Sequence, residues 1–211
     1  MKEYKLPIGC DVPETIILAD GDFPSHPLAL EWLRQCPYVV CCDGAANTYI
    51  RSGRMPEAIV GDGDSLLPDI KERYASLIHS EAEQETNDLS KAFRFCLSQE
   101  RRRITIMGAT GKREDHTIGN VSLLADYMEQ AEVSMMTDYG IFVPIREDSM
   151  FESYIGQQIS VFNMNSTALS AEGLAYPLSV FTNWWQGTLN EALARHFIIR
   201  TEGKVLVFMV F

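Results

Sequence analysis

Short apolar runs alternate with helix-like segments through the first two-thirds of the chain, and this alternation limits the possible folds more than any other feature of the sequence. The runs show no regular alternation of polar residues, so both faces of each predicted strand are apolar. Such strands are typical of a parallel sheet that helices cover on both faces. The predicted strands are residues 15–20, 38–42, 58–60, 104–107 and 133–137.

Helices are predicted between these strands. Residues 27–35 carry a proline in their first turn, where proline is well tolerated. Residues 89–97 place apolar side chains at i, i+3, i+4, i+7 and i+8, which gives a helix one apolar face. Residues 45–52 and 116–130 are the other predicted helices. Residues 1–139 are therefore predicted to form a Rossmann-like parallel α/β domain.

The pattern changes after Tyr139, where short β-type runs follow one another without helices between them. Turn residues such as Glu202-Gly203 separate the runs. The runs are residues 141–145, 158–162, 196–199 and 204–208. Residues 140–211 are therefore predicted to be a small all-β domain resembling a sandwich or a barrel.

The charge balance argues against some classes of partner. The chain has 18 lysine and arginine residues against 29 aspartate and glutamate residues, a formal net charge of −11. Broad binding to nucleic acid or to an anionic membrane needs a basic surface, so neither is expected. A phosphate ligand stays compatible with this balance, because a divalent cation held by carboxylates can supply positive charge.

A cytoplasmic location is expected from the hydropathy of the sequence, its first residues and its cysteines. No run approaches the roughly 18 to 20 apolar residues that cross a bilayer, and the first residues lack the apolar region of a secretory signal. The 5 cysteines form no C-x-x-C pair. Neither a disulfide framework nor a zinc site is expected, and a cytoplasmic protein with reduced thiols is predicted.

Acidic residues and glycines follow directly after four of the predicted strands. The segments are Asp20-Gly21, Asp43-Gly44, Asp62-Gly-Asp64-Ser65 and Gly108-Ala-Thr-Gly111. The carboxyl ends of parallel strands lie along one edge of an open sheet, and ligands bind at this edge. The four segments are therefore expected to meet at one crevice, where glycine allows a close approach of backbone and ligand.

The segment Gly61-Asp-Gly-Asp-Ser65 is the sharpest local feature. Two carboxylates one residue apart at a strand end can hold a hard cation such as Mg²⁺. An ordinary polar turn is the alternative, since aspartate, glycine and serine are common turn residues. An EF-hand is excluded, because Leu66 and Leu67 stand where that loop needs an oxygen ligand and a glycine.

A further carboxylate stands at the start of the helix predicted around residues 89–97. Asp88 and Lys91 are spaced i, i+3 and share a helix face, with Arg94 a turn further on. One interpretation is a helix cap at Thr86 or Asn87 together with a solvated ion pair. The other is a third metal carboxylate with a lysine beside it that meets phosphate oxygens.

The segment Gly108–His116 connects a predicted strand to a predicted helix. Such a loop can present backbone N–H groups and a helix N-terminus to an anion. It is neither a Walker A loop nor G-x-G-x-x-G, because Arg113 follows Gly111-Lys112 and Ile106 stands where the first Walker glycine belongs. Arg113 could hold a phosphate with two hydrogen bonds, and Asp115 could orient it. An ordinary connection is the alternative.

Together these segments resemble the thiamine pyrophosphokinase family. Those that recur in the family's order and at similar spacing are Asp43–Asn47, Gly61–Ser65, Gln84–Lys91, and Gly108–His116 with Asn120. They cover about residues 20–125. In the second predicted domain, residues 173–178 and 187–190 look like the family's thiamine-binding signatures.

The resemblance implies an activity. The family transfers the diphosphate of ATP to the hydroxyl of thiamine with Mg²⁺, giving thiamine diphosphate and AMP. It implies that residues 1–139 form a nucleotide-binding catalytic domain, and that residues 140–211 bind thiamine and dimerise. The partners would be thiamine, ATP and a second copy of the chain, with active sites between the subunits of the homodimer.

Residue roles are implied by position alone. Asp62, Asp64 and Asp88 would hold Mg²⁺ and the triphosphate. The implied catalytic residues are Asp43, Asp64, Lys91, Arg113 and Asp115. The implied binding residues for ATP and thiamine are Gly21, Asp43, Gln84, Asn87, Lys91, Gly108, Gly111, Arg113, Tyr176 and Asn190. Asp43, Asp64 and Asp115 are all open as the group that accepts the alcohol proton.

Tyr176 occupies the place of the family's aromatic residue, and the chain departs from the family pattern at Leu189 and Lys112. Tyr176 stands where some members carry tryptophan, Leu189 replaces the serine of a Ser-Asn pair, and Lys112 stands where glycine is frequent. Two alternative functions follow. One is a non-catalytic homologue that binds thiamine or a nucleotide, and the other is a diphosphotransferase that acts on another alcohol.

Overall fold

The computed structural model of the chain describes residues 1–7, 11–81, 83 and 85–211. The chain divides into two compact units. One is Gly9–Asp138, called here the α/β unit, and the other joins Met1–Ile8 to Tyr139–Phe211 and is called the β unit. Helices and sheets are both present, so the prediction of a mixed α/β protein is confirmed.

The α/β unit is built on six parallel strands. Their order is β7-β6-β2-β3-β4-β5. The bounds are β2 Thr15–Leu18, β3 Val39–Cys42, β4 Ala58–Gly61, β5 Ile78–Ser80, β6 Arg103–Met107 and β7 Glu132–Met136. Leu18 lies opposite Cys41 on one side and Met107 on the other. The carboxyl ends of these three strands are therefore level, as the apolar runs predicted.

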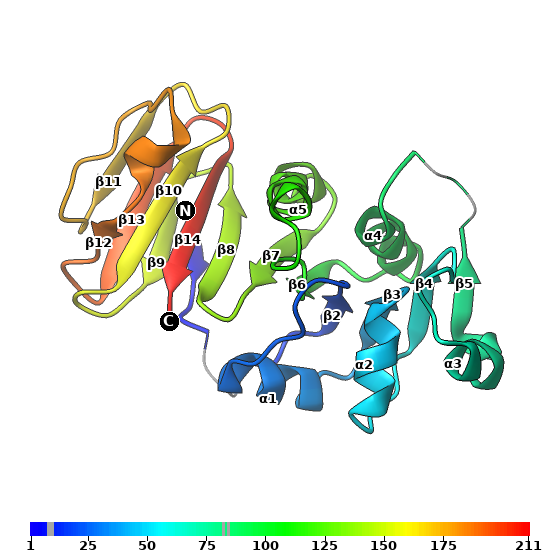
Figure 1. Cartoon of the computed structure of the whole chain (residues 1–211). Helices are drawn as coiled ribbons and strands as arrows, with labels where there is room; N and C mark the ends of the chain where they lie inside the picture. Colours follow the sequence, from blue (N-terminus) through cyan, green and yellow to red (C-terminus); the bar gives the residue numbers. More distant parts are fainter. Residues whose placement is uncertain (8–10, 82, 84) are drawn as a thin grey trace. The chain divides into compact units, whose positions relative to one another are not determined.

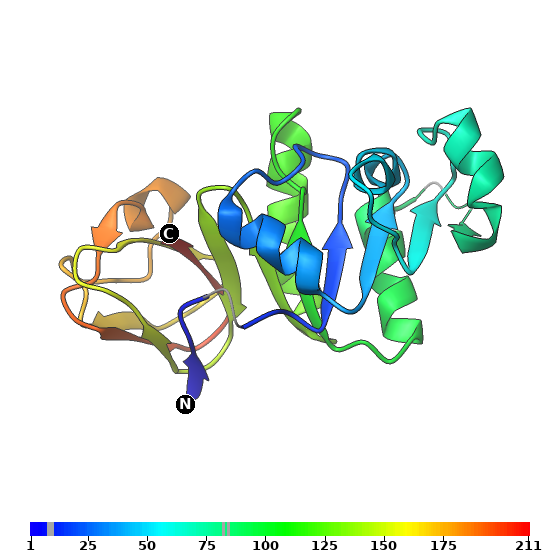
Figure 2. The same cartoon turned by 90° about the horizontal axis from the view of Figure 1, so that it is seen from below.

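Helices cover both faces of this sheet. They are α1 Pro27–Gln35, α2 Ala45–Arg51, α3 Pro68–Arg73, α4 Asp88–Ser98 and α5 Glu114–Tyr127, with a short 3₁₀ helix, η1, at Ala75–Leu77. Figures 1 and 2 show α1 and α2 on one face and α4 and α5 on the other. The apolar face predicted for α4 is the face that packs on the sheet, because Leu89, Ala92, Phe93 and Cys96 are buried.

The β unit consists of two sheets around one apolar core. One sheet has the order β12-β10-β14-β8, with bounds Asn190–Glu191, Gln158–Asn163, Val205–Val210 and Gly140–Ile145. The other has the order β1-β9-β13-β11, with bounds Lys2–Tyr4, Ser149–Glu152, His196–Thr201 and Leu169–Glu172. Phe151, Phe197, Val161 and Val207 lie in the shared core. A second 3₁₀ helix, η2, spans Trp184–Gly187.

The first strand has a partner that the sequence did not predict. Lys2 pairs in parallel with Ser149, and β1 thus forms the edge of a sheet in the β unit. Among the described residues, no helix has both the length and the apolar character needed to cross a membrane.

Candidate active site

The loops after four parallel strands meet at the carboxyl edge of the α/β sheet. Gly21, after β2, donates its N–H to the carbonyl of Gly108, after β6, at 2.6 Å. Ser65, after β4, donates its N–H to Asp43 Oδ2, after β3, at 3.1 Å. A side chain at Gly21 would collide with the Gly108 and Thr110 carbonyls, so only glycine allows this approach. The structure thus brings the four predicted segments to one edge.

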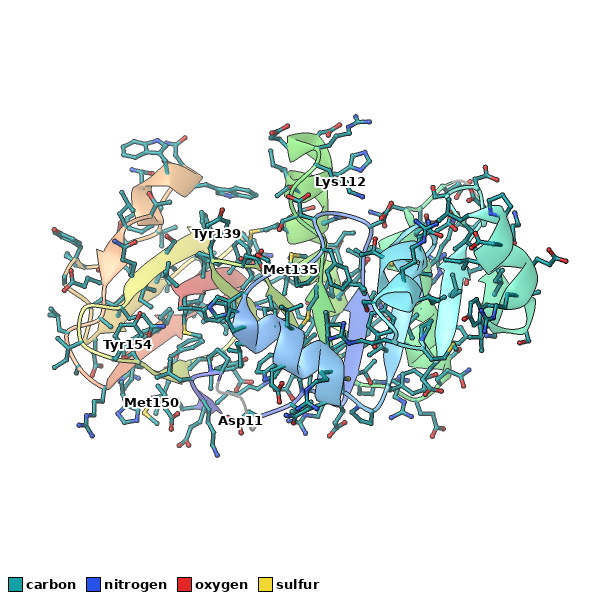
Figure 3. All side chains as sticks on the ribbon, turned by 60° about the horizontal axis from the view of Figure 1, so that its bottom comes forward. Asp11, Lys112, Met135, Tyr139, Met150 and Tyr154 are labelled. Carbon is teal, nitrogen blue, oxygen red and sulfur yellow. The ribbon has the colours of Figure 1, made fainter. Side chains whose placement is uncertain are left out.

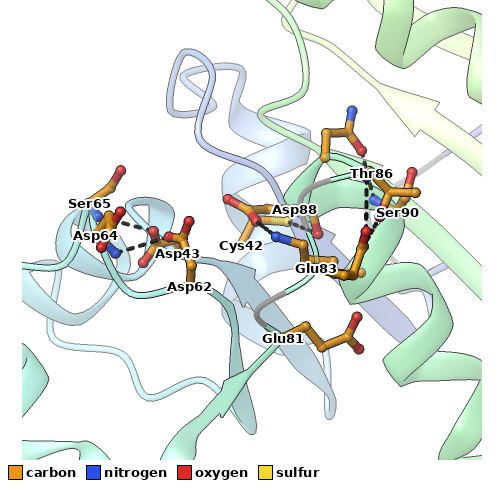
Figure 4. A network of polar contacts seen from close by, with 12 residues as sticks. Cys42, Asp43, Asp62, Asp64, Ser65, Glu81, Glu83, Thr86, Asp88 and Ser90 are labelled. Carbon is orange, nitrogen blue, oxygen red and sulfur yellow. Dashed lines mark hydrogen bonds and ion pairs between the residues drawn. The ribbon is translucent and has the colours of Figure 1, made fainter.

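The turn after β4 is ordered by its own carboxylate and by a lysine. Asp62 Oδ1 accepts a hydrogen bond from the Asp64 N–H at 3.1 Å. Lys71 on α3 donates to the carbonyl of Gly63 at 3.0 Å, a contact that the sequence did not predict. Figure 4 shows Asp62, Asp64 and Ser65 grouped around Asp43. Gly61–Ser65 is therefore a polar turn that also places its carboxylates beside Asp43.

Asp43 is a buried carboxylate with unsatisfied bonding capacity. Its side chain is buried, and Oδ1 has no hydrogen-bond partner among the residues that the structure describes. Burial raises the pKa of Asp43, and the nearby carboxylates of Asp88 and Asp62 raise it further, while the Ser65 N–H acts in the opposite direction. The surroundings thus disfavour the negative charge on Asp43, and a bound cation would relieve this cost.

Asp88 begins α4 and holds a buried lysine. Asn87 is the N-cap of α4, and its side chain accepts the N–H of Ser90 at 2.9 Å. Lys91 Nζ lies 3.1 Å from Asp88 Oδ1. The alternative is confirmed in its cap at Asn87 and in its ion pair, but the Lys91 side chain is only 3% exposed, so the lysine is not solvated. Burial is the largest single effect and opposes the charge on Lys91, but the hydrogen bond with Asp88 and the negative charges of Asp88, Asp62 and Glu83 together outweigh it, so the pKa of Lys91 is raised.

Gly61 separates the Asp43 and Asp88 carboxyl groups. A Cβ atom on Gly61 would lie 2.8 Å from the Cβ of Asp43 and 3.4 Å from the Cγ of Asp88. The first distance is too short for two carbon atoms, and both carboxyl groups flank the same backbone position. Asp43, which follows β3, and Asp88, which begins α4, can therefore lie close together because position 61 lacks a side chain.

The carboxylates do not form a complete metal cage. Within the described part of the chain, no group of three histidine, cysteine, aspartate or glutamate side chains is arranged to hold a metal ion. Mg²⁺ needs fewer protein ligands than this, because it often binds one or two carboxylates and completes its shell with water and substrate phosphates. The unpartnered Asp43 oxygen and the neighbouring carboxylates are donors of the kind that Mg²⁺ prefers.

The glycine-rich loop after β6 is tied to the start of α4. Asn87 Nδ2 donates to Asn120 Oδ1 on α5 at 3.1 Å, and Asn120 Nδ2 donates to the Ala109 carbonyl at 2.8 Å. Gly108 and Gly111, which flank Ala109 and Thr110, both have positive φ angles. The loop predicted to bind phosphate and the helix that carries Asp88 are therefore held together by a chain of side-chain amides.

Arg113 and Asp115 pair with each other on the surface. Arg113 Nε and Nη2 donate to the two Asp115 oxygens at 3.0 and 2.5 Å, and both side chains are exposed. The hydrogen bond with Arg113 lowers the pKa of Asp115. The guanidinium fork predicted to bind phosphate is thus occupied by Asp115.

The predicted residue Gln84 lies outside the described residues. Described residues on either side of it are held to α4 by Arg94. Arg94 Nη2 lies 2.8 Å from Glu81 Oε2 and 2.8 Å from Glu83 Oε1, and the same atom donates to Thr86 Oγ1 at 3.1 Å. Arg94 therefore ties Glu81, Glu83 and Thr86 to α4.

In the β unit, Asn190 binds the backbone of Tyr176. The Tyr176 N–H donates to Asn190 Oδ1 at 3.0 Å, and Asn190 Nδ2 donates to the Tyr176 carbonyl at 2.8 Å. Asn190 is buried, whereas the Tyr176 side chain is exposed. The neighbouring Leu189 is exposed with φ near +60°. Asn190 is therefore placed to hold Tyr176 rather than to present its own amide to solvent.

Two family models match this chain. The model described as "Thiamin pyrophosphokinase, catalytic domain" matches residues 29–136, and the model described as "Thiamin pyrophosphokinase, substrate-binding domain" matches residues 140–208. A curated relative, thiamine pyrophosphokinase 1 of Oryza sativa subsp. japonica, is 30% identical over 129 residues, which are 49% of this chain and 49% of the relative. The chain spans about half the length of the curated relatives it matches.

Solved structures share the fold. Thiamin pyrophosphokinase from Candida albicans aligns with a TM-score of 0.81 at 18% identity, covering 100% of this chain and 93% of that one. Thiamine pyrophosphokinase from Bacillus subtilis aligns with a TM-score of 0.78 at 20% identity, covering 93% and 98%. With both family models matched in order along the sequence, the chain belongs to the thiamin pyrophosphokinase family.

Proposed function

We propose that the chain is a thiamine pyrophosphokinase that transfers the diphosphate of ATP to the hydroxyl of thiamine and releases AMP. The observation that carries this proposal is the close approach of Asp43, Asp62 and Asp88, with buried Lys91, in a chain of this family. Carboxylates that gather Mg²⁺ and cations that neutralise oxygen charge are the groups that phosphoryl-type transfer requires.

Asp62, Asp64 and Asp88 are proposed to hold Mg²⁺, with the ATP phosphates supplying further oxygen ligands. The unpartnered Asp43 oxygen and its raised pKa support a cation at this edge of the sheet. When bound, Mg²⁺ would neutralise charge on the phosphate oxygens. Lys91 would act beside it, since its ammonium is already fixed by Asp88.

The reaction forms one bond and breaks another. The thiamine hydroxyl oxygen bonds to the β-phosphorus of ATP, the bond from that phosphorus to the α,β-bridging oxygen breaks, and AMP leaves with the electron pair. The alcohol proton passes to a carboxylate. Asp43 and Asp64 both stay open for this role, whereas Asp115 is engaged by Arg113 and its lowered pKa makes it a weaker base.

Backbone and side-chain donors are proposed to position the polyphosphate. Gly21, Gly108 and Gly111 line the loops at the strand ends, and Asn87 links α4 to the glycine-rich loop. Arg113 would bind phosphate after exchanging its present partner, Asp115. Gln84 belongs to the same proposal on the strength of the family pattern alone.

Tyr176 is proposed to offer its exposed ring to thiamine, with Asn190 holding the backbone at that position. A homodimer is also part of the proposal, as the family pattern implies. Analytical ultracentrifugation tests the dimer directly, and a chain that sediments as a monomer at micromolar concentration would contradict it.

A coupled assay for AMP tests the proposed activity. With Mg²⁺, ATP and thiamine, we expect AMP and thiamine diphosphate in equal amounts, and no AMP without thiamine. Asp64→Ala should lower the rate by at least about 100-fold, whereas Asp69→Ala, at the exposed start of α3, should leave it unchanged. Formation of ADP, AMP release without thiamine, or thiamine binding without turnover would each contradict the proposal.

A further inference from the structure

We propose that Lys112 is an additional phosphate-binding residue in this chain, which Asp20 holds at the crevice until a polyphosphate takes over its ammonium group. The inference rests on the proposed function, because the polyphosphate is that of the bound ATP. It concerns a residue that the family pattern does not supply, since glycine is frequent at this position.

The first support is the contact itself. Lys112 Nζ donates to the Asp20 carbonyl at 2.8 Å and lies 3.1 Å from Asp20 Oδ1. Both side chains are about half exposed, at 53% and 47%. Exposed ion pairs of this kind contribute little to stability. Asp20 therefore keeps the ammonium in place without binding it tightly, and exchange for a doubly charged phosphate group costs little.

The second support is the backbone of Lys112. Its φ angle is +56°, in the left-handed region that residues with a Cβ atom seldom adopt. A residue other than glycine is destabilising in this backbone conformation. A weak surface ion pair does little to offset this destabilisation, so stability alone gives little reason for a lysine at this position. Backbone strain that stability does not explain is a common feature of functional sites.

The third support is the position of Asp20 within the site. Asp20 Oδ2 lies 2.6 Å from the Cβ position of Gly44, directly after Asp43, and Ser65 Cβ lies 3.1 Å from the same point. Ser65 in turn donates its N–H to Asp43. The Lys112 ammonium thus binds a carboxylate, Asp20, that itself lies next to the turn proposed to hold Mg²⁺. Figure 3 labels Lys112 just before α5, close to the loop after β2.

The fourth support is the state of the other cations. Lys91 is buried against Asp88, and Arg113 is held by two hydrogen bonds to Asp115. Lys112 makes a single hydrogen bond to a carboxylate, whereas Arg113 makes two, and its side chain is half exposed, whereas that of Lys91 is buried. Of these three cations, Lys112 is the one most easily redirected to an incoming anion.

Calorimetric titration with Mg²⁺ and ATP, without thiamine, tests the exchange. Lys112→Gln should weaken ATP binding about tenfold, as expected for loss of a charge-assisted hydrogen bond. Arg51→Gln removes the same charge from the exposed last turn of α2 and should change binding less than twofold.

Lys112→Gly fits the backbone and should melt no lower than the wild type, yet should bind ATP as weakly as Lys112→Gln. In turnover, the KM for ATP should rise while the KM for thiamine stays constant.

Asp20→Asn separates phosphate binding from a merely structural tie between the two loops. We expect it to tighten ATP binding when Lys112 is present, and to do so less in the Lys112→Gln background. Three results would overturn the inference. The first is an equal ATP affinity in Lys112→Gln and Arg51→Gln, and the second is a loss of ATP affinity in Asp20→Asn as large as that in Lys112→Gln. The third is an equal gain in ATP affinity from Asp20→Asn whether position 112 is lysine or glutamine. A wild-type chain that binds no ATP would instead overturn the proposed function on which the inference rests.

Discussion

The ammonium of Lys91 lies 3.1 Å from the Asp88 carboxylate and is almost fully removed from solvent. A buried cation is costly unless it is paired, and here the pair stands at the first turn of α4, beside the strand ends that carry Asp43 and Asp62. Positive charge is therefore fixed at the place where a polyphosphate is proposed to bind.

Lys91→Met keeps the length of the side chain and removes its charge. We expect kcat to fall at least about 100-fold, because a fixed cation no longer neutralises the developing oxygen charge. Asp88 is partly exposed and can be hydrated, so the melting temperature should change by only a few degrees. Steady-state assays and thermal melts measure both, with Lys5→Met as the matched surface control. Normal kcat in Lys91→Met would contradict this role.

Asp43→Asn should stabilise the fold while it abolishes activity. Burial raises the pKa of Asp43 above its ordinary value of 3.8, so the folded chain binds this proton more tightly than the unfolded chain does. The charged form thus lowers stability above the raised pKa, and this cost fades as the pH falls through it. Asparagine can still accept the Ser65 N–H.

The expected gain is about 1 kcal/mol at pH 7, shrinking towards pH 4. Thermal melts across this range measure it, and Asp69→Asn at an exposed site should show no such trend. A lower melting temperature for Asp43→Asn at pH 7 would contradict the account.

Gly61→Ala should disturb Asp43 and Asp88 together. The new Cβ would lie 2.8 Å from the Cβ of Asp43, too close for two carbons, and 3.4 Å from the Cγ of Asp88. Overpacking of this kind costs about 1–3 kcal/mol. We expect a lower melting temperature and weaker Mg²⁺-dependent ATP binding, measured by calorimetry. Gly119→Ala meets no atom within 4 Å and stands at an ordinary backbone conformation, so it separates loss of glycine from crowding. Unchanged ATP binding in Gly61→Ala would count against the shared site.

Asn190→Ala should affect thiamine and not ATP. It removes both hydrogen bonds to the Tyr176 backbone and leaves part-buried polar groups without these partners, at a cost of about 1 kcal/mol. The KM for thiamine should rise several-fold while the KM for ATP stays constant. Tyr176→Phe keeps the ring and should retain the wild-type KM for thiamine, whereas Tyr176→Ala should not. Equal effects on both KM values would refute this role of Asn190.

Much of the α/β unit was predictable because its strands are apolar on both faces. The predicted helix at residues 27–35 has the bounds of α1, and the runs around Val40 and Ile106 became central strands. β1 was not predictable. Its three residues, Lys2–Tyr4, carry little apolar pattern, and its partner β9 lies far along the chain. Such pairing depends on tertiary contacts that local sequence does not encode.

In the candidate site, the sequence predicted which strand ends meet but not which side chains pair. Position after a strand was enough to group Asp43 with the turn after β4. The i, i+3 spacing suggested that Asp88 and Lys91 interact, yet only packing decides that Lys91 is buried. The bond between Lys112 and Asp20 joins residues 92 positions apart and depends on a left-handed backbone that no local signal indicated.

Mn²⁺, which can replace Mg²⁺ and is visible by electron paramagnetic resonance, gives the most direct test of the proposed metal–polyphosphate site. We predict that the wild-type chain binds Mn²⁺ together with ATP. Asp62→Asn, Asp64→Asn and Asp88→Asn should each weaken that binding at least about tenfold, whereas Asp69→Asn should leave it unchanged. Wild-type affinity in all three variants would contradict the claim that these carboxylates from separate segments share one metal-bound polyphosphate.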